Sequence, residues 1–140
     1  MIAVGKRLKI LDAALALFEA RGFHATAVPE IAAEAQVAVG TIYRHFPTKE
    51  ALGAALLEAW HARFADEVLA PYPANATPRA AFRLTWRRMA AFARSFPAAQ
   101  RFLDLHHHDP YAGPPAAAAE ARFVGALGEL VDWGRREGTM

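Results

Sequence analysis

Apolar residues recur at intervals of three and four along most of the chain, which is the period of an amphipathic α-helix. In the first half, this pattern predicts helices over residues 6–20, 28–35, 39–46 and 49–69. The residues between the helices suit helix ends. Gly22 fits a left-handed stop, Pro29 fits the first turn of a helix, and Thr48 is a good N-cap.

The helical pattern continues in the second half after one clear break. The segment PYPANATP at 71–78 carries three prolines, and its last two residues give an N-cap followed by proline at the first helical position. A fifth helix then runs to residue 93, a sixth runs to residue 108, and a seventh begins at the segment GPPAAAA. No stretch alternates as a strand does. The predicted fold class is therefore all-α.

Three short helices with a tight turn at 36–38 follow the order of a helix-turn-helix. Ile31, Val37, Ile42 and Phe46 supply a small core together with the first and fourth helices. Such a core holds the third helix on the surface, where its first half can enter a major groove about 12 Å wide. We predict a homeodomain-like, helix-turn-helix DNA-binding domain over residues 1–48. A helical effector and dimerisation domain is expected over 49–140.

The composition limits which classes of protein are possible, but it does not identify a binding partner. The formal net charge is only +2, and residues 1–50 hold six basic and five acidic side chains. Bulk charge therefore gives no argument for nucleic acid, although basic residues cluster at 6–9 and at 44–49. The chain has no cysteine, no signal peptide and no apolar run long enough to span a membrane. We expect a cytoplasmic protein with no membrane partner.

The segments ILDAALALFEARGF, EIAAEAQV and VGTIYRHFPTKEAL resemble the N-terminal DNA-binding domain of the TetR family of regulators. The last of these segments is the most specific. The resemblance implies a regulator, usually a repressor, that binds a double-stranded DNA operator as a homodimer. It also implies a helical second domain that takes a small-molecule effector. No phosphate-binding loop, nucleophile motif or paired-carboxylate signature stands out, so we expect neither an enzyme nor a cofactor.

Matched position by position, the resemblance implies a set of DNA contacts in the first domain. The positions are Thr26, Val39, Gly40, Thr41, Tyr43, Arg44, His45 and Lys49. Thr26 matches a phosphate-binding hydroxyl, and Thr41, His45 and Lys49 match other positions that hold phosphates. Val39, Gly40, Tyr43 and Arg44 match positions that contact base edges, and Tyr43 matches a phosphate position as well. Arg44 is the favoured specific contact because arginine on guanine O6 and N7 is the commonest pairing.

Three positions depart from the family pattern. Gln36 stands where the turn glycine is often found, and Ala27 and Ala38 stand where serine or threonine usually caps the second and third helices. A missing N-cap costs about 1 kcal/mol. We therefore expect these departures to affect DNA affinity more than the fold.

The second domain offers fewer specific signals. Trp86, Met89, Phe92 and Phe102 are candidates for an effector pocket, but aromatic residues at helical spacing more often form a core. The consecutive histidines 106–108 point in different directions on a helix, so a metal site there is not favoured.

The chain is shorter than usual members of the family, and we expect that the last two helices, which normally form the dimer interface, are lacking. A dimer then needs another surface, such as the exposed side of the fifth and seventh helices. One alternative is a truncated interaction module that pairs with a full-length relative without binding its own operator. A small helical enzyme that uses the histidine run is a further alternative, and it is not favoured.

Overall fold

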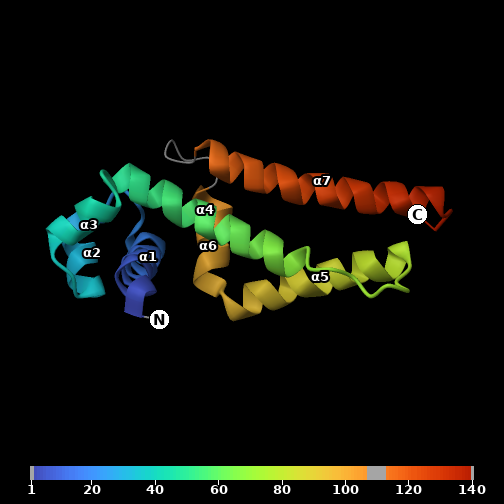
Figure 1. The fold of residues 1–140 in the computed structure, drawn as a ribbon, viewed down its shortest axis with the longest axis horizontal. Helices are drawn as coiled ribbons and strands as arrows, with labels where there is room; N and C mark the ends of the chain where they lie inside the picture. The colour runs from blue at the N-terminus through green and yellow to red at the C-terminus, as the bar shows by residue number, and fades with distance from the viewer. Residues whose placement is uncertain (1, 107–112, 140) are drawn as a thin grey trace.

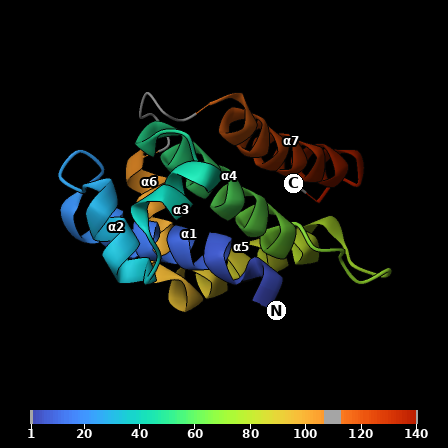
Figure 2. The ribbon, with the colours of Figure 1, turned by 60° about the vertical axis from the view of Figure 1, so that its left-hand side comes forward.

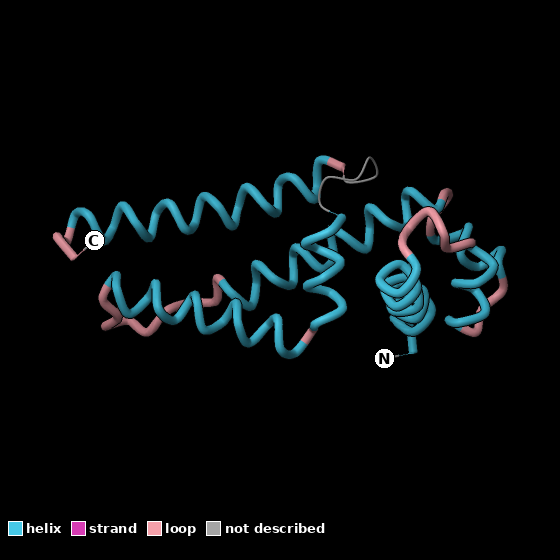
Figure 3. The backbone as a smooth tube through the Cα atoms, turned by 180° about the vertical axis from the view of Figure 1, so that it is seen from behind, coloured by secondary structure: helices cyan, strands magenta, loops and turns pink. Residues whose placement is uncertain are grey.

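The computed structural model describes residues 2–106 and 113–139. These residues form helices and loops with no strand, which confirms the all-α prediction (Figure 3). The helices are α1 (Ile2–Arg21), α2 (Val28–Ala35), α3 (Val39–His45), α4 (Lys49–Val68), α5 (Pro78–Ser95), α6 (Pro97–His106) and α7 (Pro114–Arg136).

The first three helices gather at one end of the molecule and form a unit that we call the head (Figure 1). Helix α4 leaves the head and runs through the remaining helices, α5 to α7, which together with α4 form the body (Figures 1 and 2). Helix α4 contacts α1 in the head and also α5, α6 and α7 in the body. The head is therefore mounted on a long helix that belongs to the body's own packing.

One cluster of buried apolar residues extends from the head into the body. Phe18 of α1 stacks near Phe102 of α6, with ring centroids 6.4 Å apart and ring planes 21° apart. The large fully buried side chains of this cluster are Ile10, Phe18, Ile31, Ile42, Leu52, Leu56, Leu57, Phe92 and Phe102. Burial of apolar area is the main stabilising contribution in a helical protein. Head and body consequently share a single core.

Helix ends follow the residues that the sequence supplies for them. Gly22 adopts φ +88° and ends α1, and its N–H donates to the Phe18 carbonyl oxygen at 2.8 Å. The Thr48 hydroxyl accepts from the N–H of Ala51 at 3.0 Å, and Thr77 caps α5 in the same way. These stops and caps confirm the expected helix boundaries, because each one satisfies backbone groups that a helix end leaves open.

The proline-rich link between α4 and α5 is held by side chains of α5. The Arg88 guanidinium donates to the carbonyl oxygens of Ala70 and Pro71 and lies 5.1 Å from the ring centroid of Tyr72. The Tyr72 hydroxyl in turn lies 2.5 Å from the buried hydroxyl of Thr85. The link is thus a fixed corner that turns α5 back along α4. Within the described ranges, no helix combines the length and the apolar character required to cross a membrane.

Candidate nucleic-acid interface

A tight turn joins α2 to α3, as the sequence predicted. Gln36 adopts φ 59° and ψ 43°, and its N–H donates to the carbonyl oxygens of Ala32 and Ala33. The N–H of Val37 donates to the Ala32 oxygen at 3.0 Å. Among the described residues, Gln36 is the one non-glycine with positive φ. The turn therefore needs the left-handed conformation that glycine adopts without strain.

Helix α3 has one side in the core and one side in solvent. Ile42 and Thr41 are buried, while 47% of Tyr43 and 37% of Val39 are exposed. Gly40, Arg44 and His45 are exposed as well. Residues four apart lie on adjacent turns of a helix, so Val39 and Tyr43 share a face and Gly40 lies one turn from Arg44. The structure thus brings the α3 residues expected to contact DNA to the surface, except Thr41.

Arg44 is positioned by its own helix. Its Nη2 donates to the Thr41 hydroxyl oxygen at 3.1 Å. This bond uses one N–H of the guanidinium and leaves the others for an acceptor outside the protein. A Cβ built at Gly40 would meet no other atom within 4 Å, so the surface beside Arg44 is open. An approaching groove wall can therefore reach this side of α3 without a clash.

The structure corrects the expectation for Thr26. Only 1% of this residue is exposed, and its hydroxyl lies 2.8 Å from the Gly22 carbonyl oxygen and 3.3 Å from that of Leu17. A threonine hydroxyl has a single proton to donate. Because that proton is used inside the head, Thr26 fixes the loop between α1 and α2 and does not present a hydroxyl to phosphate.

Lys49 also binds the loop between α1 and α2. Its Nζ donates to the carbonyl oxygens of Phe23 at 2.8 Å and Thr26 at 3.1 Å. The ammonium also lies 4.4 Å from the centroid of the Phe23 ring, which is within the range of a cation–π contact. Two of its three protons are therefore used within the protein, and Lys49 is first of all a structural link between α4 and the loop.

The first turns of α2 and α3 lack side-chain caps, as expected from Ala27 and Ala38. At α2, the Glu30 carboxylate accepts from the N–H of Ala27 at 3.2 Å and pairs with Arg21. An anion thus already lies at this helix end, where the helix dipole favours negative charge. At α3 no described side chain caps the first turn, and the N–H of Thr41 donates to the Ala38 carbonyl oxygen at 3.0 Å.

Basic residues of α1 lie beside the same surface. The Arg7 guanidinium lies 4.8 Å from the centroid of the Phe46 ring, directly after α3. Lys6, Arg7 and Lys9 are all exposed. The positive charge of Arg7 therefore lies close to the end of α3 that carries Arg44, although the chain as a whole is nearly neutral.

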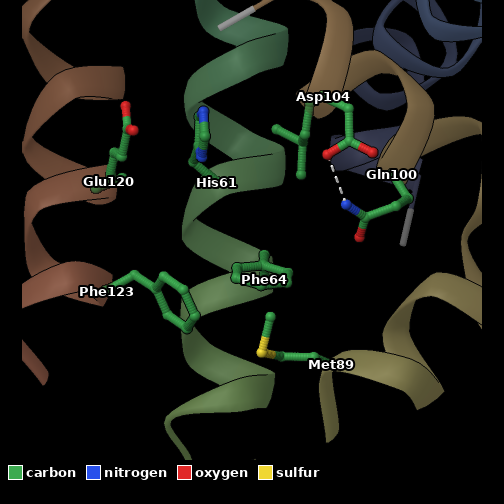
Figure 4. A pocket seen from close by; sticks show the side chains of 9 residues that line it. His61, Phe64, Met89, Gln100, Asp104, Glu120 and Phe123 are labelled. Atoms are coloured by element: carbon green, nitrogen blue, oxygen red, sulfur yellow. Dashed lines mark hydrogen bonds between the residues drawn. The ribbon is translucent and has the colours of Figure 1, made fainter. Parts of the chain in front are cut away.

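The body contains a cavity of about 290 Å³ among α4, α5, α6 and α7 (Figure 4). Its polar lining comes from His61, Gln100, Asp104 and Glu120, and its apolar lining includes Phe64, Met89 and Phe123. Figure 4 shows His61 between Glu120 on α7 and Asp104 on α6. The Nε2 of Gln100 donates to Oδ1 of Asp104 at 2.9 Å.

The expected effector residues separate into two groups. Met89 lines the cavity, and Trp86, which is 66% exposed, lines an adjoining apolar groove. Phe92 and Phe102 are 1% and 0% exposed and belong to the core, where Phe92 packs edge-on against Phe64 with ring centroids 5.1 Å apart. The expectation that Phe92 and Phe102 line a pocket is therefore corrected, because both face the inside of the helix bundle.

Sequence reasoning missed most of the cavity lining. His61 with Phe64, Gln100 with Asp104, and Glu120 with Phe123 are spaced by three or four residues, so each pair shares a helix face. A search for polar residues on the same helix face as aromatic residues would have identified the first and third of these pairs, but not Gln100 with Asp104.

The histidine run lies almost entirely outside the described residues, since α6 ends at His106 and positions 107–112 are not described. Elsewhere in the described ranges, no group of three or more histidine, aspartate or glutamate residues is placed to hold a metal ion.

Comparison with known proteins identifies the same head. Residues 10–56 match the family model for bacterial regulatory proteins of the tetR family. The HTH-type transcriptional regulator RutR of Escherichia coli K12 is 34% identical over 130 residues. That match covers 91% of this chain and 57% of RutR. The HTH-type transcriptional repressor KstR of Rhodococcus jostii RHA1 is 50% identical over 44 residues, which cover 31% of this chain and 21% of KstR.

A solved structure extends the similarity over nearly the whole chain. A tetR-family transcription regulator from Shewanella sp. PV-4 superposes with a TM-score of 0.83 at 32% sequence identity. The match covers 95% of this chain and 71% of that protein. Both the head and the body therefore have counterparts in one known architecture, while this chain spans little more than half the length of RutR.

Proposed function

This chain belongs to the TetR family of bacterial regulatory proteins, and we propose that it binds operator DNA through α3 and regulates transcription. The observation that carries the proposal is the surface of α3, where Tyr43 and Arg44 are exposed while Ile42 anchors the helix in the core. A relative named as a repressor, KstR, favours repression as the direction of control.

In the proposed complex, α3 lies in the major groove and Arg44 contacts a base edge. The bond from Arg44 to Thr41 limits the motion of the guanidinium before DNA arrives, which lowers the entropy lost on binding. Val39, Gly40 and Tyr43 face the same groove, and His45 and Arg7 contact the phosphate backbone on either side. Lys49 contributes through its remaining proton, and Thr26 only through the loop that it holds.

The two proposed domains follow one another along the chain. Residues 1–48 form the DNA-binding domain, and residues 49–140 form the effector and dimerisation domain. A homodimer places two α3 helices about one helical turn, ~34–36 Å, apart on the operator. A small molecule in the body then favours a head spacing that does not fit the operator. This role requires no enzymatic step and places the protein with the DNA in the cytoplasm.

An interaction module without an operator of its own is not favoured. The exposed arginine on α3 and the open surface beside it at Gly40 suit contact with DNA, which such a module would not make. The exposed face of α3 has the size and chemistry of a DNA contact, and the core beneath it is fully formed.

Mobility shift of duplex DNA tests the proposal. The probe is the DNA flanking the protein's own gene, compared with a shuffled duplex over a range of salt concentrations. Arg44→Ala lowers affinity for the specific duplex by about 10- to 100-fold, as expected for one lost arginine–guanine contact. The matched control is Arg94→Ala, an exposed arginine of α5, which leaves affinity unchanged. Equal binding of both duplexes by the wild type would refute the proposal.

A further inference from the structure

Two helix faces of the body leave apolar side chains in solvent. On α5, Phe82, Trp86 and Ala90 recur every four residues and share a face, and 66% of Trp86 is exposed. On α7, 60% of Val124 is exposed. We infer that these faces join two copies of this chain, with α5 of each copy packed against α7 of the other. The homodimer itself rests on the proposed function, whereas its surface follows from these two faces.

Both faces border the same opening in the body. The groove beside Trp86 is continuous with the cavity, because three residues line both. Figure 4 shows Met89 of α5 on one side of this cavity and Glu120 of α7 on the other. Val124 lies one turn after Glu120 on α7, so it is close to the same edge. One partner that packs over the opening therefore reaches Trp86 and Val124 together.

The face of α7 has room for a large side chain. Ala121, Gly125 and Gly128 are exposed beside Val124. A Cβ built at either glycine would meet no other atom within 4 Å. Because the distance between two packed helices depends on the side chains at their contact, these small residues allow Trp86 of a second copy to approach.

The two helices are fixed to one another within the chain. Helix α5 contacts α7, and both contact α4. The Arg79 guanidinium also donates to the Thr139 carbonyl oxygen at 3.0 Å, which joins the start of α5 to the residues after α7. The two faces are therefore already in place before a partner binds, and this lowers the entropy lost on association.

Charge is distributed unevenly over the body. Helix α5 carries five arginines and no acidic residue, whereas the rest of residues 49–140 carries six basic and ten acidic side chains. Arg83, Arg87 and Arg94 are exposed and make no hydrogen bond or ion pair with any described residue. Ala90 has Arg87 three residues before it and Arg94 four residues after it, so arginines border the apolar face of α5. This face suits a partner that carries negative charge.

Helix α7 supplies the complementary charge. Glu120, Glu129 and Asp132 are exposed and likewise have no hydrogen bond or ion pair in the described part of the chain. Among the basic residues of α7, Arg122 pairs with Asp66 of α4 at 3.1 Å, and the other two lie in the last turn. Before its last turn, the unpaired charge of α7 is therefore negative.

These charges favour one way of pairing two copies. Two α5 helices that faced each other would bring unpaired arginines together, and like charges across an interface cost free energy. Packing α5 of one copy against α7 of the other brings opposite charges together instead. A two-fold axis then forms this contact twice and closes the assembly as a dimer.

Sedimentation equilibrium on the whole chain without DNA tests the inference. At micromolar concentration we expect twice the mass of one chain. Trp86→Ser weakens the dimer at least about tenfold, because a large interface side chain is lost at two symmetric places. Gly125→Leu weakens it as well, while circular dichroism shows an intact helical fold, because the added side chain meets free space in the single chain. The matched control is Leu8→Ser, which truncates a side chain 49% exposed in the head and leaves the dimer unchanged.

Charge reversal tests which helices meet. One variant carries Arg83→Glu with Arg87→Glu on α5, and a second carries Glu129→Lys with Asp132→Lys on α7. Each variant alone associates at least about tenfold more weakly than the wild type, because like charges then oppose each other. An equal mixture of the two restores the dimer, since α5 of each variant meets opposite charge on α7 of the other. Glu34→Lys, an exposed position of α2, is the control and changes nothing.

The inference is overturned if the wild type sediments as a monomer at micromolar concentration or forms assemblies larger than a dimer. It is also overturned if Trp86→Ser and both charge variants dimerise as well as the wild type, or if the mixture associates no better than its components. These failures are distinguishable from failure of the operator proposal, because sedimentation uses no DNA and the mobility shift compares two duplexes on the unaltered chain.

Discussion

The head and the body differ in what they leave exposed. In the head, buried residues such as Phe18, Ile31 and Ile42 fill the interior, and the exposed face of α3 is the surface proposed to contact DNA. In the body, 66% of Trp86 and 60% of Val124 are exposed, and a cavity lies between the helices. Exposed apolar side chains occur in both regions, since 49% of Leu8 is exposed in the head, but in the body Trp86 lines a groove that adjoins the cavity.

The largest effect on the free energy of unfolding is expected where the head packs against the body. Phe18→Ala removes a fully buried ring that packs against Phe102 of the body, and it lowers the free energy of unfolding by about 3–5 kcal/mol. All three tryptophans lie in the body. Their fluorescence therefore reports whether a loss of stability in the head also destabilises the body. In urea denaturation, we expect the tryptophan transition and the helical circular dichroism to shift together.

The matched control for this prediction is Phe82→Ala, which truncates a phenylalanine that is 41% exposed on α5. It is expected to cost less than Phe18→Ala, since part of the Phe82 ring is already exposed and less apolar area is lost. A tryptophan transition that stays in place for Phe18→Ala, while the circular dichroism shifts, would show two separate cores.

A smaller effect is expected at the loop between α1 and α2. Lys49→Met removes the donor shared by the carbonyl oxygens of Phe23 and Thr26, and it lowers stability by about 1–2 kcal/mol. The measurement is thermal or urea unfolding, with Lys6→Met, an exposed lysine of α1, as the control. If Lys49→Met leaves stability unchanged and only flattens the salt dependence of DNA binding, its role is phosphate contact after all.

The two regions also differ in how much of each could be predicted from the sequence. The head could be predicted helix by helix, because Gly22 and Thr48 mark a helix stop and a cap locally. The roles of Thr26 and Lys49 could not, since a hydroxyl or an ammonium donates equally well to a phosphate or to a carbonyl oxygen. Which acceptor it meets depends on a loop that folds back against α4, and this is a tertiary contact.

In the body, helical spacing shows which residues share a face but not what that face meets. Phe92 and Met89 are three residues apart on α5, yet one belongs to the core and the other lines the cavity. His61, Asp104 and Glu120 line one cavity because α6 and α7 both pack against α4. These are tertiary contacts, which no local motif indicates.

A gain of stability is expected at the turn of the head. Gln36 adopts the left-handed conformation, which costs a non-glycine residue roughly 1–2 kcal/mol. Gln36→Gly relieves this strain and adds flexibility to the unfolded chain, so we expect a net gain of about 0.5–1 kcal/mol. Glu34→Gly, two residues earlier in α2, is the control and lowers stability by about 1 kcal/mol. The same sign of change for both variants would contradict the turn geometry.

The smallest effect is expected at the missing cap of α3. Ala38 has the extended backbone of an N-cap, with φ −73° and ψ 149°, but no side chain that can accept a hydrogen bond. Ala38→Ser supplies an acceptor for the first N–H groups of α3 and raises the free energy of unfolding by about 0.5–1 kcal/mol. Ala38→Val, which adds bulk without an acceptor, should give no gain in the same urea titration.

The reciprocal change, Thr48→Ala, removes an existing cap from α4 and should cost about as much as Ala38→Ser gains. If serine and valine have the same effect at position 38, the end of α3 is stabilised by packing alone and needs no cap.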